Sequence, residues 1–346
     1  TIIGSSANTT NDGENATAIG AGASASSTAV AIGSLASSAE QGVAVGNFAQ
    51  AGLLSTSVGL SAGGIGAGNT AVGYNALAVG EAGNNVAMGS SAMPATITGF
   101  NNVGIGAGVM NNNISGSENV AIGTSALGST LSNNNNVAIG QEAMLGATTA
   151  NNCTAVGFLS DFTTPNITNS MALGSLSRVG ISNAVGIGNT SVTSIGGYED
   201  WTNFSDGRFK TNLQENVPGL AFIQGLRPVT YTLDVHGIRK ELGTEDSYLN
   251  PEKEHIRYTG FIAQEVEETA QELGYDFSGV DRPGSDADFY GLRYATFVVP
   301  LVQAVQEQQD QIEDLQNRVQ SQQSMIEQQA ALLASFEARL SQLESQ

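Results

Sequence analysis

The sequence predicts a mainly β N-terminal part, built as a parallel β-solenoid, followed by a small α+β domain and a C-terminal coiled coil. Three observations predict this architecture: a short Gly-containing motif repeated along the first half of the chain, a sharp change of charge near Ser205, and six heptads close to the C-terminus. The predicted boundaries are a repeat array at 1–197, a linker at 198–204, a mixed domain at 205–301 and a coiled coil at 302–346.

The repeated motif is a small residue and an apolar residue followed by Gly. Twelve copies run from Ala18-Ile19-Gly20 to Gly186-Ile187-Gly188, with successive Gly spacings of 13, 13, 13, 14, 16, then 17 five times, then 14. Such units are too short to be helical repeats. Each length suits a strand of about four or five residues, a Gly turn, a second short strand and a return loop.

In this solenoid, we expect the apolar residue before each Gly to stack on its counterpart in the next coil and to form a thin core of Ile, Val, Leu and Met. The Gly residues would supply positive φ and close approach between coils. The run Asn133–Asn136 suits left-handed positions and amide ladders. A core this thin favours several chains sharing it, without fixing their number.

The charge distribution marks a domain boundary. The formal net charge of −20 makes nucleic acid and anionic membranes unlikely partners. Up to Asp200, Arg178 is the only basic residue against nine acidic ones, whereas 11 of the 12 basic residues lie beyond Ser205. The residues up to Asp200 therefore differ from those beyond Ser205 in their content of charged side chains.

Several kinds of site are not expected. Cys153 is the only cysteine, which excludes an intrachain disulfide and suggests a buried thiol. His236 and His255 have no neighbouring cysteine, so no metal site is predicted. The stretch Gly64–Gly68 lacks the remaining features of a dinucleotide loop, so no cofactor is expected.

The chain also gives no sign of membrane insertion. No run of 18 apolar residues and no signal peptide is present, and the first residue is Thr1 rather than Met. We therefore expect any N-terminal signal or anchor to lie outside this sequence.

The hexapeptide Ser205–Lys210 follows Phe204 at the boundary. Serine becomes a nucleophile when a neighbour accepts its proton, and lysine does so only as the neutral amine. A separation of five residues suits a turn or bent strand rather than one helix face. By itself the pattern also fits a capped turn with a solvated lysine.

The sequence from Ser205 to about Gln320 resembles the C-terminal intramolecular chaperone of endosialidases and phage tail fibres. The resemblance is carried by three stretches: Pro218 to Tyr231, Tyr258 to Val266, and Tyr290 to Val302. In that family a Ser-Asp-x-Arg-x-Lys motif opens the domain. The resemblance implies that Ser205 is the nucleophile, Lys210 the base and Phe204–Ser205 the cleaved bond, with Asp206 and Arg208 as positioning residues.

The repeats resemble a second family. Asn119-Val120-Ala121-Ile122-Gly123 and Asn136-Val137-Ala138-Ile139-Gly140 are similar to the head repeats of YadA-like trimeric adhesins. This resemblance implies a left-handed parallel β-roll with three chains side by side outside the cell. The C-terminal anchor of those adhesins has no counterpart here, so we expect N-terminal attachment, as in tail fibres.

Helical and strand signals complete the second part. A strand is predicted at 227–233, and a helix at 261–273 with Phe261, Ile262 and Val266 on its apolar side. From Ala295 onward there is no Gly, and a heptad pattern indicates a coiled coil. Its a positions are Val305, Ile312, Val319, Ile326, Leu333 and Leu340, and its d positions are Gln308, Leu315, Gln322, Gln329, Phe336 and Leu343. The heptads permit a dimer, whereas both resemblances imply a homotrimer.

The function predicted is a trimeric extracellular fibre, on a virion tail or a bacterial surface, whose C-terminal chaperone templates assembly and then cuts itself off once. The alternative is a permanent adhesive fibre that keeps an uncleaved C-terminal cap. No activity on external substrates is expected, and the repeat array shows no convergent carboxylates with flanking aromatics, as a glycan-cleaving enzyme would need. The sequence does not indicate which receptor the fibre binds.

Overall fold

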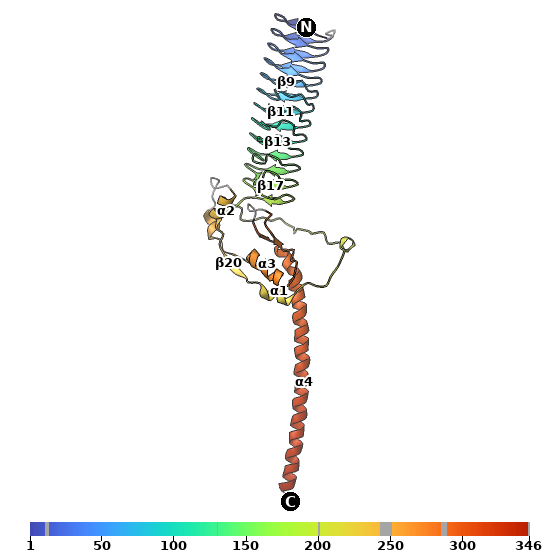
Figure 1. Ribbon diagram of the computed structural model, residues 1–346, viewed down its shortest axis with the longest axis vertical. Coiled ribbons are helices and arrows are strands. Elements are labelled where there is room, and N and C mark those ends of the chain that lie inside the picture. The colour runs from blue at the N-terminus through green and yellow to red at the C-terminus, as the bar shows by residue number, and fades with distance from the viewer. Residues whose placement is uncertain (11–13, 130, 200, 243–250, 285–288, 345–346) are drawn as a thin grey trace. The chain divides into compact units, whose positions relative to one another are not determined.

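The computed structural model describes residues 1–10, 14–129, 131–199, 201–242, 251–284 and 289–344 (Figure 1). Contacts divide the chain into two compact units. One holds the repeat array Thr1–Gly196 together with Leu233–His255, which includes α2 (Val235–Glu241) and η2 (Pro251–His255). The other holds Gly197–Thr232, Ile256–Pro283 and Phe289–Gln346.

The repeat array is a parallel β-solenoid, as predicted. Each copy of the Gly motif forms one strand, and 13 strands pair in chain order into one parallel sheet. These strands are β1 (Ile2–Ile3), β3 (Thr17–Ile19), β5 (Val30–Ile32), β7 (Val43–Val45), β9 (Thr56–Val58), β10 (Thr70–Val72), β11 (Val86–Met88), β12 (Val103–Ile105), β13 (Val120–Ile122), β14 (Val137–Ile139), β15 (Thr154–Val156), β17 (Met171–Leu173) and β19 (Val185–Ile187). They have two or three residues rather than the four or five expected.

Second short strands also occur, as expected, but only in some coils. In the described part of the array they form a parallel four-stranded sheet and a separate parallel pair. The sheet contains β2 (Asn8–Thr9), β4 (Ser24–Ala25), β6 (Ser37–Ser38) and β8 (Gln50–Ala51), and the pair contains β16 (Asp161–Phe162) and β18 (Arg178–Val179). Pairing is in register, with Ala121 opposite Ala138 and Ile122 opposite Ile139.

The composition of the solenoid core differs from the prediction. The apolar residue before each Gly stacks on its counterpart but points outward: Ile122 and Ile139 are each 37% exposed. The small residue one position earlier, such as Ala121, is fully buried. Side chains of a strand alternate between its two faces, so only one of these two rows faces inward, and the predicted core row was wrong.

Leucine and methionine enter the core from another position. In the longer coils the fourth residue after the strand Gly is fully buried: Leu77, Met93, Met110, Leu127 and Met144. Each has a positive φ, between 47° and 55°, which is rare for large side chains. The core around the shorter coils at 16–36 consists of alanine alone. The extra residues of the longer coils therefore widen the core.

The strand glycines confirm the predicted close approach. Gly123 has φ +131°, and a Cβ placed on it would lie 2.4 Å from the carbonyl oxygen of Gly140 in the next coil. The same close approach occurs at Gly106, which would meet Gly123. A side chain at these positions would therefore clash with the backbone of the adjacent coil.

Asparagines form the predicted ladder inside the solenoid. The Oδ1 atom of Asn119 accepts hydrogen bonds from the backbone and side-chain nitrogens of Asn136, at 3.0 and 3.2 Å. Asn119 in turn donates to Oδ1 of Asn102 and to the carbonyl oxygen of Asn133. Asn135 has φ +57°, so the run Asn133–Asn136 supplies both a left-handed residue and a ladder step.

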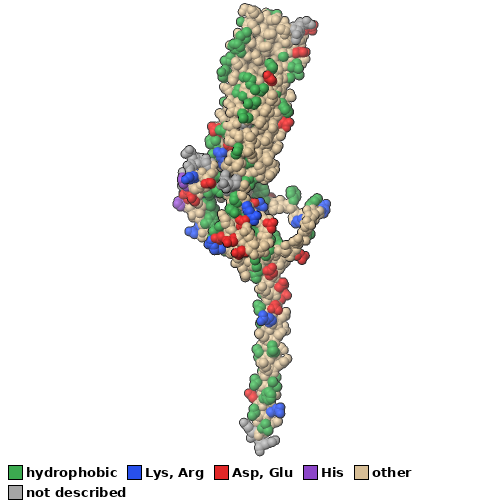
Figure 2. Space-filling view, viewed as in Figure 1, with side chains coloured by type: hydrophobic (Ala, Val, Ile, Leu, Met, Phe, Trp, Pro, Cys, Tyr) green, Lys and Arg blue, Asp and Glu red, His purple; other side chains and the backbone are tan. Residues whose placement is uncertain are grey.

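Two other polar groups are buried near the C-terminal end of the array. Cys153 is a buried thiol, as expected, and burial raises its pKa. Arg178 pairs with the buried carboxylate of Asp161 at 3.1 Å. The backbone nitrogens of Gly146 and Phe162 also donate to Asp161, although burial still raises the pKa of this carboxyl. On the face of the array that Figure 2 shows, few charged side chains are visible.

The second unit is a small α+β body followed by a long helix. Its elements are η1 (Gly207–Phe209), α1 (Leu220–Gly225), β20 (Val229–Tyr231), β21 (Tyr258–Gly260), α3 (Ala263–Glu272), β22 (Val280–Asp281), β23 (Gly291–Leu292), η3 (Tyr294–Phe297) and α4 (Val298–Glu344). The strands pair antiparallel, β20 with β21 and β22 with β23. The core joins Phe222, Val266, Ala270, Phe277 and Phe297.

The predicted strand and helix of this body are confirmed, with shorter bounds. Val266 is buried on α3, as expected. Phe261 and Ile262 precede the helix instead of lying on it, and Ile262 is 39% exposed. Their assignment to the apolar helix face was therefore wrong.

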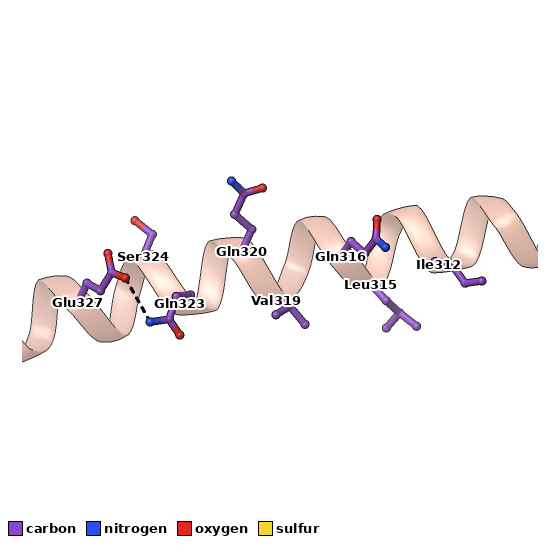
Figure 3. Close-up of a pocket in the computed structure, with 8 residues that line it drawn as sticks. All are labelled: Ile312, Leu315, Gln316, Val319, Gln320, Gln323, Ser324 and Glu327. Atoms are coloured by element: carbon purple, nitrogen blue, oxygen red, sulfur yellow. Dashed lines mark hydrogen bonds between the residues drawn. The ribbon is translucent and has the colours of Figure 1, made fainter.

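The C-terminal helix α4 has 47 residues and carries Pro300 in its first turn, where a missing backbone N–H is tolerated. The apolar a and d side chains are between 48% and 71% exposed in the single chain. Figure 3 shows Ile312, Leu315 and Val319 on one side of this helix, with Gln316 and Gln320 on the other. The predicted seam is thus present as an open apolar stripe. None of the described helices is both long and apolar enough to span a membrane.

The close approach at Gly123 gives a first testable prediction. Gly123→Ala places a methyl group against Gly140 and forces a non-glycine residue into a positive φ, which costs at least about 1–3 kcal/mol. We expect a lower melting temperature of the array, measured by circular dichroism. Gly196→Ala is the control, because a Cβ there meets nothing within 4 Å. Equal melting temperatures for both variants would contradict the close-approach argument.

The asparagine ladder gives a second testable prediction. Asn119→Ala removes the hydrogen bonds that its side chain makes with the buried carbonyl oxygen of Asn133 and the buried backbone nitrogen of Asn136 in the next coil, at about 1–3 kcal/mol for each unsatisfied group. Urea unfolding should show a lower free energy of unfolding, whereas Asn112→Ala, at an exposed position, should leave it unchanged. A loss no larger for Asn119→Ala than for this control would show that the ladder is not stabilising.

Candidate functional site

The hexapeptide Ser205–Lys210 lies in a solvent-exposed segment of the second unit. All residues from Trp201 to Asn216 are exposed, and the one regular element among them is the 3-10 turn η1. The site is therefore shaped by local hydrogen bonds rather than by burial.

Asp206 sets the turn. Its carboxylate accepts a hydrogen bond from the backbone nitrogen of Arg208 at 2.9 Å and so caps the start of η1. The backbone nitrogens of Phe209 and Lys210 donate to the carbonyl oxygens of Asp206 and Gly207. Asparagine and aspartate commonly cap such turns in this way.

The turn brings the two predicted catalytic side chains together. Nζ of Lys210 donates a hydrogen bond to Oγ of Ser205 at 2.7 Å. A five-residue separation was expected to suit a turn, and the chain does turn here. Contact between the two groups is a geometric fact, whereas their catalytic roles remain a prediction.

Asp206 and Arg208 form an ion pair beside this contact. Nε and Nη2 of Arg208 both approach the Asp206 carboxylate, with Nη2 at 2.6 Å from Oδ2. The hydrogen bonds from Arg208 lower the pKa of Asp206, and the same pair raises the pKa of Arg208. The guanidinium also lies 5.6 Å from the ring centroid of Phe209. Asp206 and Arg208, the two predicted positioning residues, thus hold the turn together.

The aromatic side chains of the linker before the site lie in solvent. Tyr198 and Phe204 are fully exposed, and the only tryptophan, Trp201, is 86% exposed. The bond between Phe204 and Ser205 is correspondingly accessible.

A long-range contact that sequence reasoning missed fixes the start of the body. The carboxylate of Glu307, on α4, accepts a hydrogen bond from the backbone nitrogen of Leu220 at 2.7 Å and caps α1. This bond lowers the pKa of Glu307. Gly219 permits the approach, since a Cβ there would lie 2.6 Å from the backbone nitrogen of Ala304. Because the partners lie 87 positions apart in the sequence, no local signal could have indicated this contact.

The structure assigns the two histidines to short helical segments. His236 lies in α2 and His255 ends η2. Among the described residues, no group of three or more His, Cys, Asp or Glu side chains is placed to hold a metal ion.

Together, a parallel β-solenoid, a compact α+β body and a long helix with an open apolar stripe are typical of elongated fibrous proteins that assemble from several chains. Comparison with known families then gives one match: residues 205–275 match the model of a peptidase family described as chaperone of endosialidase. The match begins at Ser205 and includes the hexapeptide, α1, β20, β21 and α3. No curated protein matches the chain. The similarity of the repeats to YadA-like heads stays a resemblance, consistent with the solenoid.

The ion pair of the turn gives a prediction on pH. Arg208 lowers the pKa of Asp206, so the charged pair is present above that pKa and is lost as the pH falls through it. Removing the guanidinium in Arg208→Gln should raise the pKa of Asp206 towards the ordinary aspartate value. Carboxyl-detected NMR titration of the full chain measures this pKa.

The matched control is Arg227→Gln, which breaks another exposed ion pair, that with Glu265. It should leave the Asp206 titration unchanged. An unchanged midpoint in Arg208→Gln would mean that the pair does not form in solution.

Proposed function

We propose that the chain forms a homotrimeric extracellular fibre, on a virion tail or a bacterial surface, whose C-terminal part is an intramolecular chaperone released by self-cleavage. The observation that carries the proposal is the family match, which starts at the serine that accepts the hydrogen bond of Lys210. The domains proposed are the array at 1–197, the linker at 198–204, the chaperone at 205–301 and the coiled coil at 302–346.

The open stripe of α4 supports assembly. Six apolar a positions and three apolar d positions face solvent in one chain, and a helix with such a heptad pattern buries them only against other helices. Identical copies supply the same stripe. Three chains joined there bring three repeat segments to high effective concentration. Local helical contacts form early, which places this step before winding of the solenoid.

A template would compensate for the weakly specified register of the array itself. Each strand has only two or three residues and pairs in parallel with the strand of the next coil. A slip of register moves every side chain to a wrong neighbour or face, and short repeats specify register weakly. The outward rows, such as Ile105, Ile122 and Ile139, are 37% exposed in one chain. Neighbouring copies in the trimer would cover them.

Release uses the Ser205–Lys210 pair as nucleophile and base. Oγ of Ser205 attacks the carbonyl carbon of Phe204 while Lys210 takes the hydroxyl proton. The carbon–nitrogen bond breaks, the nitrogen of Ser205 receives the proton, and an ester links Phe204 to Oγ. Water then hydrolyses this ester. Each chain reacts once, and Asp206 and Arg208 keep the turn in shape.

Burial is the condition for this chemistry. In the single chain the lysine donates to the serine, whereas a base must accept its proton. A low-dielectric environment favours the neutral amine, which accepts. Assembly would supply that environment, so cleavage follows trimerisation rather than preceding it. Loss of the template then leaves a kinetically trapped fibre.

The test is the intact mass of the purified chain. We expect wild type to give fragments 1–204 and 205–346, and Ser205→Ala and Lys210→Ala to remain full length. Thr211→Ala, which removes an exposed hydroxyl next to the dyad, is the matched control and should cleave like wild type. Full-length trimers in all four proteins would support the alternative, a permanent fibre with an uncleaved cap, and would refute self-cleavage.

A further inference from the structure

The second unit carries an aromatic cavity of about 410 Å³. Its walls include Tyr231 of β20, Ile262 before α3, Phe289 and Tyr294. These four side chains are between 37% and 49% exposed, so the cavity opens to solvent in the single chain. Its volume falls in the range of small-ligand sites. Its lining combines aromatic rings with the polar groups of Gln264 and Tyr290, so it can accept a ring together with the polar backbone beside that ring.

The floor of this aromatic cavity belongs to the packed core. Phe261 lies at the cavity and packs against Phe297, with ring centroids 5.4 Å apart. The hydroxyl of Tyr294 accepts a hydrogen bond from the backbone nitrogen of Phe261 at 3.1 Å. The absence of a side chain at Gly260 leaves room for that hydroxyl, because a Cβ on Gly260 would lie only 2.2 Å from it. This side of the cavity is therefore fixed by contacts within the core.

The same unit contains aromatic side chains without such a site. Within the segment Tyr198–Phe209, Tyr198, Trp201 and Phe204 are 86% to 107% exposed, and Phe209 is 81% exposed. Aromatic side chains gain more from burial than most residues. A run of exposed rings and an open aromatic cavity are complementary surfaces on one polypeptide.

We propose that the aromatic cavity binds the ring of Phe204 from a neighbouring copy and thereby holds the Phe204–Ser205 bond in place for cleavage. This inference rests on the self-cleavage proposed above. We choose Phe204 among the exposed aromatic residues because the reacting carbonyl belongs to Phe204 itself. Fixing the side chain of this residue therefore restricts that carbonyl most. Binding of a group next to the reacting atoms is an established way to lower a barrier.

The neighbouring copy is favoured over the chain's own cavity by two observations. Within one chain Phe204 is fully exposed while the cavity is open. The apolar stripe of α4 is also unpaired in one chain, so the unit is complete only beside other copies. A cavity that acts between copies leaves the bond intact until the template has assembled.

The first test uses mixed trimers. One chain carries Ile262→Ser with an active Ser205, and the other carries Ser205→Ala with an intact cavity and a tag that changes its mass. Expressed alone, the Ile262→Ser chain should be cleaved on the order of 10- to 100-fold more slowly than wild type. In mixed trimers its cleavage should recover, because the partner chain supplies the cavity.

Leu273→Ser is the matched control. Leu273 follows the other end of α3, is 42% exposed compared with 39% for Ile262, and does not line the cavity. It should be cleaved at the wild-type rate, with native oligomer mass and helicity measured for all variants. Wild-type cleavage of Ile262→Ser, or no recovery in mixed trimers, would overturn the proposal. An uncleaved wild type would instead refute the self-cleavage itself.

A second readout needs no cleavage. Trp201 is the only tryptophan, so Trp201→Phe with Phe204→Trp places the single indole at the docking position, in the Ser205→Ala background. Its fluorescence emission should shift to shorter wavelength on assembly, and adding Ile262→Ser should abolish that shift while Leu273→Ser preserves it. Emission typical of exposed indole in all three proteins would show that nothing docks.

Discussion

The structure of the array depends on how closely successive coils approach one another. At the strand glycines the backbones of adjacent coils come so near that no Cβ fits, as at Gly123 against Gly140. This spacing lets each short strand pair in register with the next, and it aligns the asparagine amides into a ladder. Each coil is therefore completed only by its neighbours, as in other solenoids.

This dependence is the physical reason why the proposed template would help such an array to fold. The core of the first coils is alanine alone, which offers little apolar area for each ordered residue. Later coils add one Leu or Met each, at positive φ, which enlarges the core at a cost in backbone conformation. A thin core with weakly specified register folds best when its chains are already held together.

The sequence predicted the architecture more accurately than it predicted which side chains are buried. The repeat spacing predicted the solenoid, and the heptads predicted α4, because both are periodic along the chain. The inward row was predicted wrongly, since Ala121 and Ile122 are both apolar and a three-residue strand gives too little alternation to choose between them. Buried Leu77 and Met144 lie outside the strands, in left-handed positions, where no propensity would place large side chains.

The same distinction holds for the candidate site. A five-residue separation predicted a turn, and hydrogen bonds within the hexapeptide form one. The cap of α1 by Glu307 and the aromatic cavity join residues distant in sequence, so they required the folded chain. Neither follows from composition or spacing.

The exposure of the Ser205–Lys210 pair connects these observations. A serine and a lysine in contact but in water form a hydrogen bond in which the lysine donates, and this arrangement alone activates nothing. The missing element is an environment that removes water and fixes the scissile carbonyl. In the described part of the second unit, the open stripe of α4 and the open aromatic cavity of the α+β body are two surfaces that additional copies could cover. Under the proposed self-cleavage, assembly would therefore complete the active site and would link release of the template to formation of the trimer.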